Sequence, residues 1–259
     1  MHPPAPSPGS LPNPNSRTSS SIRRVRLLAI YTLTTALYLA LPLRADMITN
    51  GNFSQTNPSS PTDGFQLADG NNISLTDWDF EGTIGCLVPP GVTDTCGPHF
   101  ISLYTPWFSP PDNSNFVAMD ADPIITPASL SQTISGLVSG ELYTLSFMQA
   151  AAQFQPYNGA TTEWFQVTFG SQTQTTPVLD NPNNGFTNWV QQTMTFQATS
   201  TSQVLTFLAG GTPMGEPPTD LLADVSLTPT GAPEPSTYAL VLLAIVAAGV
   251  ILKWRKARS

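Results

Sequence analysis

Three acidic side chains that alternate over five residues come closest, by type and spacing, to catalytic chemistry in this 259-residue chain. In a strand, Asp77, Asp79 and Glu81 would share one face, with neighbouring carboxylates about 7 Å apart. Glycoside hydrolysis needs two carboxylates roughly 5–9 Å apart. The same alternation is also typical of a solvated strand face, which is how we interpret Asp120 and Asp122. A glycoside hydrolase therefore stays an alternative prediction.

Nucleophilic catalysis finds less support in the sequence. His99 is the only histidine beyond the first few residues. A Ser-His-Asp hydrolase needs a positioned serine, and the chain has no Gly-x-Ser-x-Gly turn. We interpret His99 as a loop residue and predict a protein that is not an enzyme, with no catalytic residue.

Aromatic side chains in a proline-rich loop suggest binding. Tyr104, Trp107 and Phe108 lie among Pro106, Pro110 and Pro111, where three rings cannot all be core-facing strand residues. Flat aromatic faces stack on sugar rings, and neighbouring polar side chains can bond hydroxyl groups. These three aromatics are the predicted ligand site. The alternative is that Trp107 plugs one end of the fold.

The distribution of charge excludes several partners. All nine basic residues lie at or before Arg44 or from Lys253 onwards, and all seventeen acidic residues lie between them. The central domain therefore has no cationic clamp for phosphate and does not attract nucleic acid. Its carboxylates must be solvated, hydrogen-bonded or neutralised by a cation such as calcium.

The N-terminal end predicts export. Residues 1–21 read as a disordered leader, and residues 22–45 as a signal peptide with three arginines before an apolar stretch. Export places Cys86 and Cys96 in an oxidising compartment, where a ten-residue spacing favours a disulfide between them. An uncleaved N-terminal anchor is the alternative for residues 22–45.

The C-terminal end, residues 231–259, has three parts. Pro233, Glu234 and Pro235 come first, the uncharged run 238–252 follows, and four basic residues end the chain. The run is long enough for a short transmembrane helix, and the basic residues would stay in the cytoplasm.

This tail resembles the PEP-CTERM sorting signal of bacterial envelope proteins, which an exosortase reads. The resemblance implies cleavage near Pro233, Glu234 and Pro235, and release or re-attachment of the exported domain. Here Ala232 precedes the motif, where the family usually has valine. The expected precursor is a single-pass membrane protein, and the expected destination is the cell envelope or the extracellular space.

Residues 46–230 predict an all-β domain, most simply a jelly-roll β-sandwich. Apolar and polar residues alternate with period two in 142–148, 164–169, 190–196 and 221–227. In 164–169 we expect Phe165, Val167 and Phe169 to lie on one face. In 190–196 we expect Val190 to lie on the same face as Met194. No amphipathic helix of ten residues is present.

The order of short motifs in this domain resembles the galactose-binding-like jelly roll of carbohydrate-binding modules and DUF642-type proteins. These motifs are 48–53, Trp78, 115–120, 130–134 and 222–227. The resemblance implies that the first and last strands lie side by side and can hold a structural calcium ion. Carried onto this chain, the calcium ligands would be Asn52 and Asp224. The family often has Glu and a second Asp where this chain has Ser54 and Ala223.

Together these features predict an exported, exosortase-sorted surface or matrix protein without enzymatic activity, which binds a polysaccharide of the matrix or cell wall. The alternative is an ice-binding or purely structural envelope protein. Ice recognition would need a flat, regular threonine array, and 173–176 is too short to form one.

Overall fold

The structure is a computed structural model that describes residues 45–57, 65–66, 74–92, 102–124 and 126–230. Residues 44–231 form one compact unit. The predicted leader, signal peptide, sorting motif and transmembrane helix lie outside the described residues, as do His99 and Cys96. Within the described part of the chain, no helix is long and apolar enough to cross a membrane.

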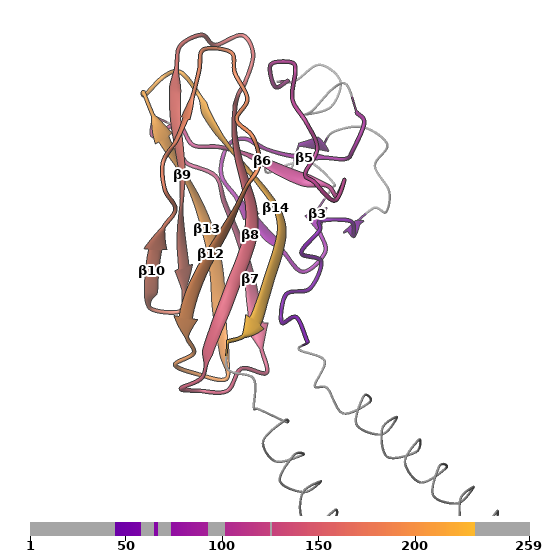
Figure 1. Cartoon of the computed structure of the whole chain (residues 1–259), viewed down its shortest axis with the longest axis vertical. Coiled ribbons are helices and arrows are strands. Elements are labelled where there is room, and N and C mark those ends of the chain that lie inside the picture. The colour runs from indigo at the N-terminus through magenta and orange to yellow at the C-terminus, as the bar shows by residue number, and fades with distance from the viewer. Residues whose placement is uncertain (1–44, 58–64, 67–73, 93–101, 125, 231–259) are drawn as a thin grey trace, which may run out of the picture. The chain divides into compact units, whose positions relative to one another are not determined.

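Strands in two face-to-face sheets make up the domain (Figure 1). Sheet I contains, in spatial order, β10 (Gln172–Thr175), β9 (Thr161–Phe169), β13 (Ser202–Thr212), β7 (Ser129–Ser135) and β4 (Asp79–Glu81), and β11 (Leu179–Asn181) pairs with β9. Sheet II contains β12 (Val190–Gln197), β8 (Leu142–Gln153), β14 (Pro218–Pro229), β6 (Phe116–Asp120), β5 (Gly85–Val88) and β2 (Phe65–Gln66). A separate pair joins β1 (Thr56–Asn57) to β3 (Ser74–Leu75).

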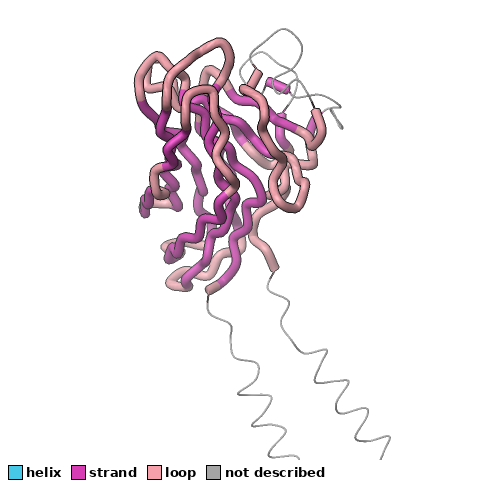
Figure 2. The backbone as a smooth tube through the Cα atoms, turned by 45° about the horizontal axis from the view of Figure 1, so that its top comes forward, coloured by secondary structure: helices cyan, strands magenta, loops and turns pink. Residues whose placement is uncertain are grey.

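The chain passes between the two sheets in the sequence of a jelly roll. It runs from β6 in sheet II to β7 in sheet I, back to β8, across to β9 and β10, and then through β12, β13 and β14 in alternation. The order β12-β8-β14-β6 faces the order β10-β9-β13-β7, the arrangement of two interlocked Greek keys. The predicted all-β sandwich is confirmed, and no helix occurs in the described residues (Figure 2).

Period-two burial produces the core between the sheets. Phe165, Val167 and Phe169 are all buried on the inner face of β9, as their alternation predicts. The register of β12 places Val190 on the same face as Met194, as predicted, although the Val190 side chain is 43% exposed and Met194 is buried. Val190 is the first residue of β12, which forms the edge of sheet II.

The opening segment lies beside the last strand, as the jelly-roll resemblance implies. The backbone N–H of Met47 donates to the carbonyl of Leu227 at 2.9 Å, and the N–H of Val225 donates to the carbonyl of Gly51 at 3.0 Å. A side chain at Gly51 would collide with the Val225 carbonyl, so glycine allows this close approach. The segment is irregular rather than a strand.

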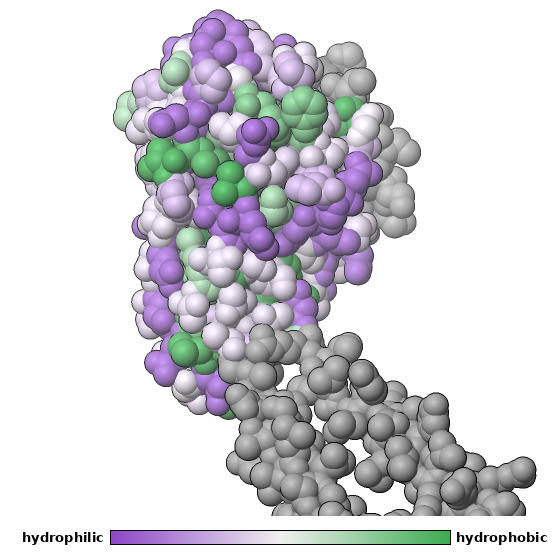
Figure 3. Space-filling view, in the orientation of Figure 1, coloured by the Kyte–Doolittle hydropathy of each residue, from purple (hydrophilic) through white to green (hydrophobic). Residues whose placement is uncertain are grey.

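A second apolar cluster covers the outer face of sheet II. Its fully buried members include Phe116, Leu221 and Phe154, and Trp107 and Trp189 pack against it. These rings come from the segments before β6 and before β12, so loops form a third, thin layer over this sheet. On the face drawn in Figure 3, hydrophobic residues gather mainly in the upper half, among hydrophilic ones.

Candidate functional site

An aromatic groove lies on the loop layer outside sheet II. Its volume is about 470 Å³. The predicted ligand residues Trp107 and Phe108 line it together with polar and small residues, namely Gly91, Val92, Thr105, Pro106, Ser109 and Asn113. The structure therefore brings an aromatic wall and hydroxyl and amide groups together in one concave site.

The two groove aromatics differ in how they are held. Trp107 is half-buried and meets Phe116 edge to face, with ring centroids 5.5 Å apart. Phe108 is 60% exposed, and its ring meets Phe186 edge to face at 5.9 Å. The indole N–H of Trp189 donates to the Phe108 carbonyl at 2.8 Å, which fixes the backbone beneath the exposed ring.

Trp107 is thus neither a plug at one end of the sandwich nor a free platform. It anchors the loop to the outer face of sheet II and leaves Phe108 as the open ring. Sequence analysis missed Phe186 and Trp189, because they lie about 80 residues away in the chain and only the tertiary structure brings them to this loop.

Tyr104 does not line the groove, unlike the other two predicted ligand residues. Its backbone N–H donates to the carbonyl of Gln153, and its hydroxyl donates to Oδ1 of Asn158 at 3.5 Å. The strand-like pairing with the end of β8 turns Tyr104 toward a different part of the surface.

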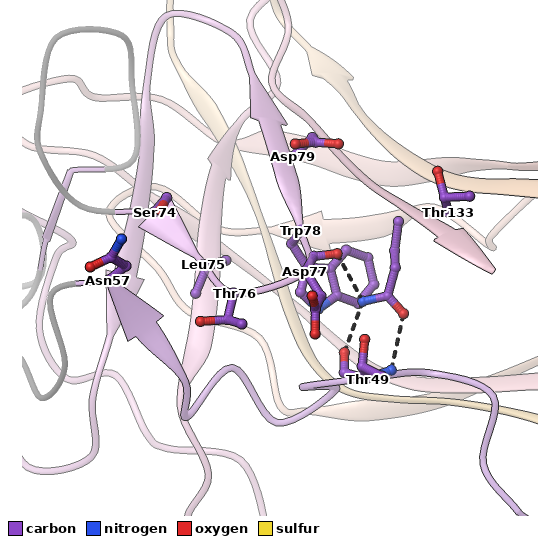
Figure 4. Close-up of a pocket in the computed structure, with 10 residues that line it drawn as sticks. Thr49, Asn57, Ser74, Leu75, Thr76, Asp77, Trp78, Asp79 and Thr133 are labelled. Atoms are coloured by element: carbon purple, nitrogen blue, oxygen red, sulfur yellow. Dashed lines mark hydrogen bonds between the residues drawn. The ribbon is translucent and has the colours of Figure 1, made fainter. Parts of the chain in front are cut away.

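A second, polar pocket of about 570 Å³ lies at the β4 edge of sheet I (Figure 4). Both Asp77 and Asp79 line it, with Thr49 and Thr133 nearby. Trp78 lies between the two acids in sequence, but its side chain is only 4% exposed and offers no stacking face. This pocket supplies carboxylates and hydroxyls without an open aromatic ring.

The predicted acidic triplet does not form a single strand face. Asp77 lies in a turn, in the left-handed region with a φ of 66°, and β4 begins only at Asp79. In Figure 4 Asp77 lies next to Thr49, and Asp79 lies apart from it along the strand. Only Asp79 and Glu81 share the outer face of β4, and Glu81 is not among the residues that line the pocket.

Small polar side chains cross the open outer face of sheet I in a row. The strand registers align Asp79, Ser131, Thr206, Thr168 and Thr173. Neighbouring strands in a sheet are rotated by about 20–25°, so a five-strand row does not lie flat. The row includes three threonines from three strands, which the sequence did not indicate, and ice binding stays an alternative.

The predicted calcium ligands Asn52 and Asp224 have separate hydrogen-bond partners. Oδ1 of Asn52 accepts from the backbone N–H and the hydroxyl of Ser54. Oδ1 of Asp224 accepts from the Ser114 hydroxyl at 2.7 Å, and Asp112 lies beside it. The register of β14 shifts between Ala223 and Ser226, and this bulge places Asp224 in the left-handed region.

The two carboxyl groups at this bulge influence each other. Burial raises the pKa of Asp224 to about 6, the Ser114 hydroxyl opposes this, and the neighbouring Asp112 carboxylate adds to it. Burial also acts to raise the pKa of Asp112, but hydrogen bonds from Ser114 outweigh it and hold that pKa below its ordinary value. A paired carboxylate site without a basic partner is one that a cation can stabilise.

Two acids that the sequence suggests to be solvated are buried instead. Asp120 and Asp122 lie inside the domain, where Oδ1 of Asp120 accepts the Asp122 backbone N–H at 2.8 Å. Burial raises the pKa of Asp120 to about 6, against that hydrogen bond and with the charge of Asp122 adding to it. Burial also raises the pKa of Glu163 to about 9 and that of Asp220 to about 8.

Cys86 is buried in β5, and the described part of the chain contains no free cysteine. Its predicted partner Cys96 lies outside the described residues, so the pairing stays a prediction. No cluster of three acidic, histidine or cysteine side chains that could hold a metal occurs in the residues the structure describes.

No protein-family model matches the chain, and no curated protein matches it. Several solved structures are similar at low identity. TmCBM61 in complex with β-1,4-galactotriose is 12% identical over 60% of this chain and 89% of that chain, with a TM-score of 0.36.

Two further solved structures are similar at the same level. The CBM22-1 xylan-binding domain from Paenibacillus barcinonensis Xyn10C is 10% identical over 74% of this chain and 99% of that chain, with a TM-score of 0.35. The K3 cleaved adhesin domain of Lys-gingipain from Porphyromonas gingivalis is 12% identical over 59% of this chain and 91% of that chain, with a TM-score of 0.38. Likeness at this level carries no argument about what the chain binds.

Proposed function

We propose that this protein is a non-enzymatic glycan-binding protein whose ligand lies in the aromatic groove. The observation that carries the proposal is the exposed ring of Phe108 above a fixed backbone, with Trp107 beside it and Thr105, Ser109 and Asn113 around it. A sugar offers an apolar C–H face to an aromatic ring and hydroxyls to polar neighbours. Fixing the ring before binding lowers the entropy lost on association.

The charge of the domain narrows the kind of glycan. No Lys or Arg lies between residues 45 and 252, whereas sixteen of the seventeen acids lie in the exported domain itself. An anionic polysaccharide would meet repulsion and would find no cationic partner. We therefore propose a neutral polysaccharide of the matrix or cell wall as the ligand.

Replacing Phe108 with alanine is expected to weaken binding to a neutral polysaccharide by about 10- to 30-fold, a loss of about 1.4–2 kcal/mol. The ring is more than half exposed, so the variant should keep the unfolding midpoint of the wild type to within a few degrees. Affinity gel electrophoresis of the purified protein against a panel of neutral and acidic polysaccharides measures the loss.

The matched control is Met214→Ala. Met214 is an exposed large apolar side chain, 62% accessible, and it does not line the groove. Its variant should bind as the wild type does. Equal affinity of Phe108→Ala and wild type, or no binding of any glycan in the panel, would contradict the proposal.

We also propose that the protein is exported and sorted to the cell envelope by an exosortase. The support is the sequence of the tail, in which Pro233, Glu234 and Pro235 precede an apolar run and a basic end. Mass spectrometry of the mature protein from its native host should find an N-terminus near Asp46 and a C-terminus near the Pro-Glu-Pro motif. A mature chain that still ends at Ser259 would overturn this.

Calcium at the β14 bulge stays part of the proposal, with Asp112 rather than Asn52 as the second side-chain ligand. The support is the contact between the Asp112 and Asp224 carboxyl groups through Ser114. Hard oxygen ligands of this type suit calcium. Asp224→Asn should lower the calcium content of the protein by one ion per chain, and an unchanged content would remove this site.

A further inference from the structure

Two buried carboxyl groups face each other across one end of the sandwich interior, away from the groove. Glu163 lies on the inner face of β9 in sheet I, and Asp220 lies on the inner face of β14 in sheet II. Both side chains are 0% exposed, and each lies within the electrostatic field of the other. Buried acids of this kind need a counter-charge or a proton.

The surroundings of Asp220 are arranged around its carboxylate. Nε2 of Gln149 donates to Oδ1 at 3.1 Å, and the backbone N–H of Gly210 donates to Oδ2 at 3.3 Å. Gln192 orients Gln149 by donating to its Oε1 at 3.0 Å. This chain of amides presents donors to both oxygens of Asp220, as suits an acceptor that carries negative charge.

The surroundings of Glu163 are different. The Thr161 side chain and the Thr219 backbone lie close enough to lower its pKa, although neither forms a hydrogen bond of good geometry to the two carboxylate oxygens. A buried ionised carboxylate without a counter-charge is strongly unfavourable. Since no Lys or Arg lies between residues 45 and 252, the domain has no basic side chain to supply one.

Two residues with neutral side-chain oxygens are buried in the same part of sheet I as Glu163. Thr161 is two residues before Glu163 on the inner face of β9. Asn181 on β11 is the direct register partner of Thr161. Nδ2 of Asn181 donates to Oγ1 of Thr161 at 3.2 Å, which leaves Oδ1 of Asn181 buried and unpartnered. At the same end of the sandwich, Nε2 of Gln153 on β8 is a buried donor without a partner.

We propose that this inner end of the sandwich is a calcium site in which Glu163 and Asp220 are the anionic ligands and Asn181 and Thr161 supply neutral oxygens. An all-oxygen set with two carboxylates and neutral donors suits calcium, which takes six to eight oxygen ligands, better than a transition metal. Two carboxylates neutralise the charge of one divalent cation. The site lies inside the sandwich and is distinct from Asp112 and Asp224 at the β14 bulge.

The test begins with purified protein that is unfolded with chelator and refolded with or without calcium chloride. Calcium at about 100-fold over the Kd should raise the Tm of the wild type by roughly 5–10 °C. Elemental analysis after desalting should find one calcium fewer in Glu163→Gln than in the wild type. The exposed change Glu81→Gln, outside both proposed calcium sites, serves as the matched control and should keep the calcium content of the wild type.

The isosteric change Glu163→Gln separates a calcium ligand from a protonated core carboxyl. If the acid only carries a proton, the variant will be as stable as the wild type or more stable with calcium present, and its calcium content will not change. Either result overturns the proposal. A wild type that responds to magnesium or sodium as strongly as to calcium also overturns it.

Thr161→Val provides a second variant should Glu163→Gln fail to refold. It removes one neutral oxygen and keeps the side-chain volume, and it should weaken calcium binding by about tenfold. Unchanged calcium affinity in Thr161→Val, measured by titration calorimetry, would count against the ligand set. The groove residues take no part in this site, so glycan binding by the Phe108 groove can fail or succeed independently.

Discussion

Trp78→Ala is expected to destabilise the domain by about 3–5 kcal/mol and to lower its Tm by roughly 6–20 °C. The Trp78 ring is buried, meets Phe53 at a centroid distance of 5.5 Å and lies 6.4 Å from Phe207. Its indole N–H also donates to the carbonyl of Asn50 at 3.1 Å. The substitution therefore opens a cavity and releases the opening segment from the core. Urea unfolding followed by tryptophan fluorescence and circular dichroism measures the loss.

Trp164→Ala is the matched control for that loss. Trp164 is half-buried on the outer face of sheet I, where its indole packs against Gly210. Removal of this ring exposes backbone rather than opening an internal cavity, so we expect at most about 1–2 kcal/mol. Equal losses for the two variants would show that Trp78 does not join the opening segment to the core.

Asp120→Asn is expected to reduce, by up to about 3 kcal/mol, the fall in stability that the wild type shows between about pH 4 and pH 6, to which the other acids with raised pKa values also contribute. The unfolded state has the ordinary pKa of 3.8, and burial raises the folded pKa to about 6. Below pH 4 both states are protonated. As the pH rises through this interval the unfolded state releases its proton first, which lowers the free energy of unfolding by up to about 3 kcal/mol.

The free energy of unfolding of both proteins at pH 4 and pH 7, from urea titrations, measures this difference. The side chain of Asp120 is fully buried, so solvent screening does not reduce the effect. Exposed Glu81→Gln is the control, and it should keep the slope of the wild type. Asp120→Asn with that same slope would refute the prediction.

Period-two alternation predicted the sandwich because a strand with one buried face shows a local alternation of apolar and polar residues. Phe165, Val167 and Phe169 needed no knowledge of their partners to be placed on one face. Val190 was placed on the correct face, but its exposure could not be predicted because it depends on the position of β12 at the edge of sheet II, which pairing between distant strands decides. The order of strands in the two sheets also emerges only from pairings distant in the chain.

The candidate site was half predictable. The composition of the proline-rich loop identified Trp107 and Phe108, but the same composition included Tyr104, which pairs with the end of β8 instead. The anchors Phe186 and Trp189 carry no local signal, because their role depends on lying next to the loop in space.

The sequence by itself determined that the domain would be all-β and would contain no basic side chain, because alternation and composition are local properties of the chain. Only the tertiary structure decided which acids would be buried. Glu163 has the same parity as Phe165 and Val167, and Asp120 follows four apolar residues, but their burial depends on which faces the two sheets and the loop layer cover. Because the domain has no Lys or Arg to pair with them, these buried carboxyl groups must be neutralised by a proton or a cation.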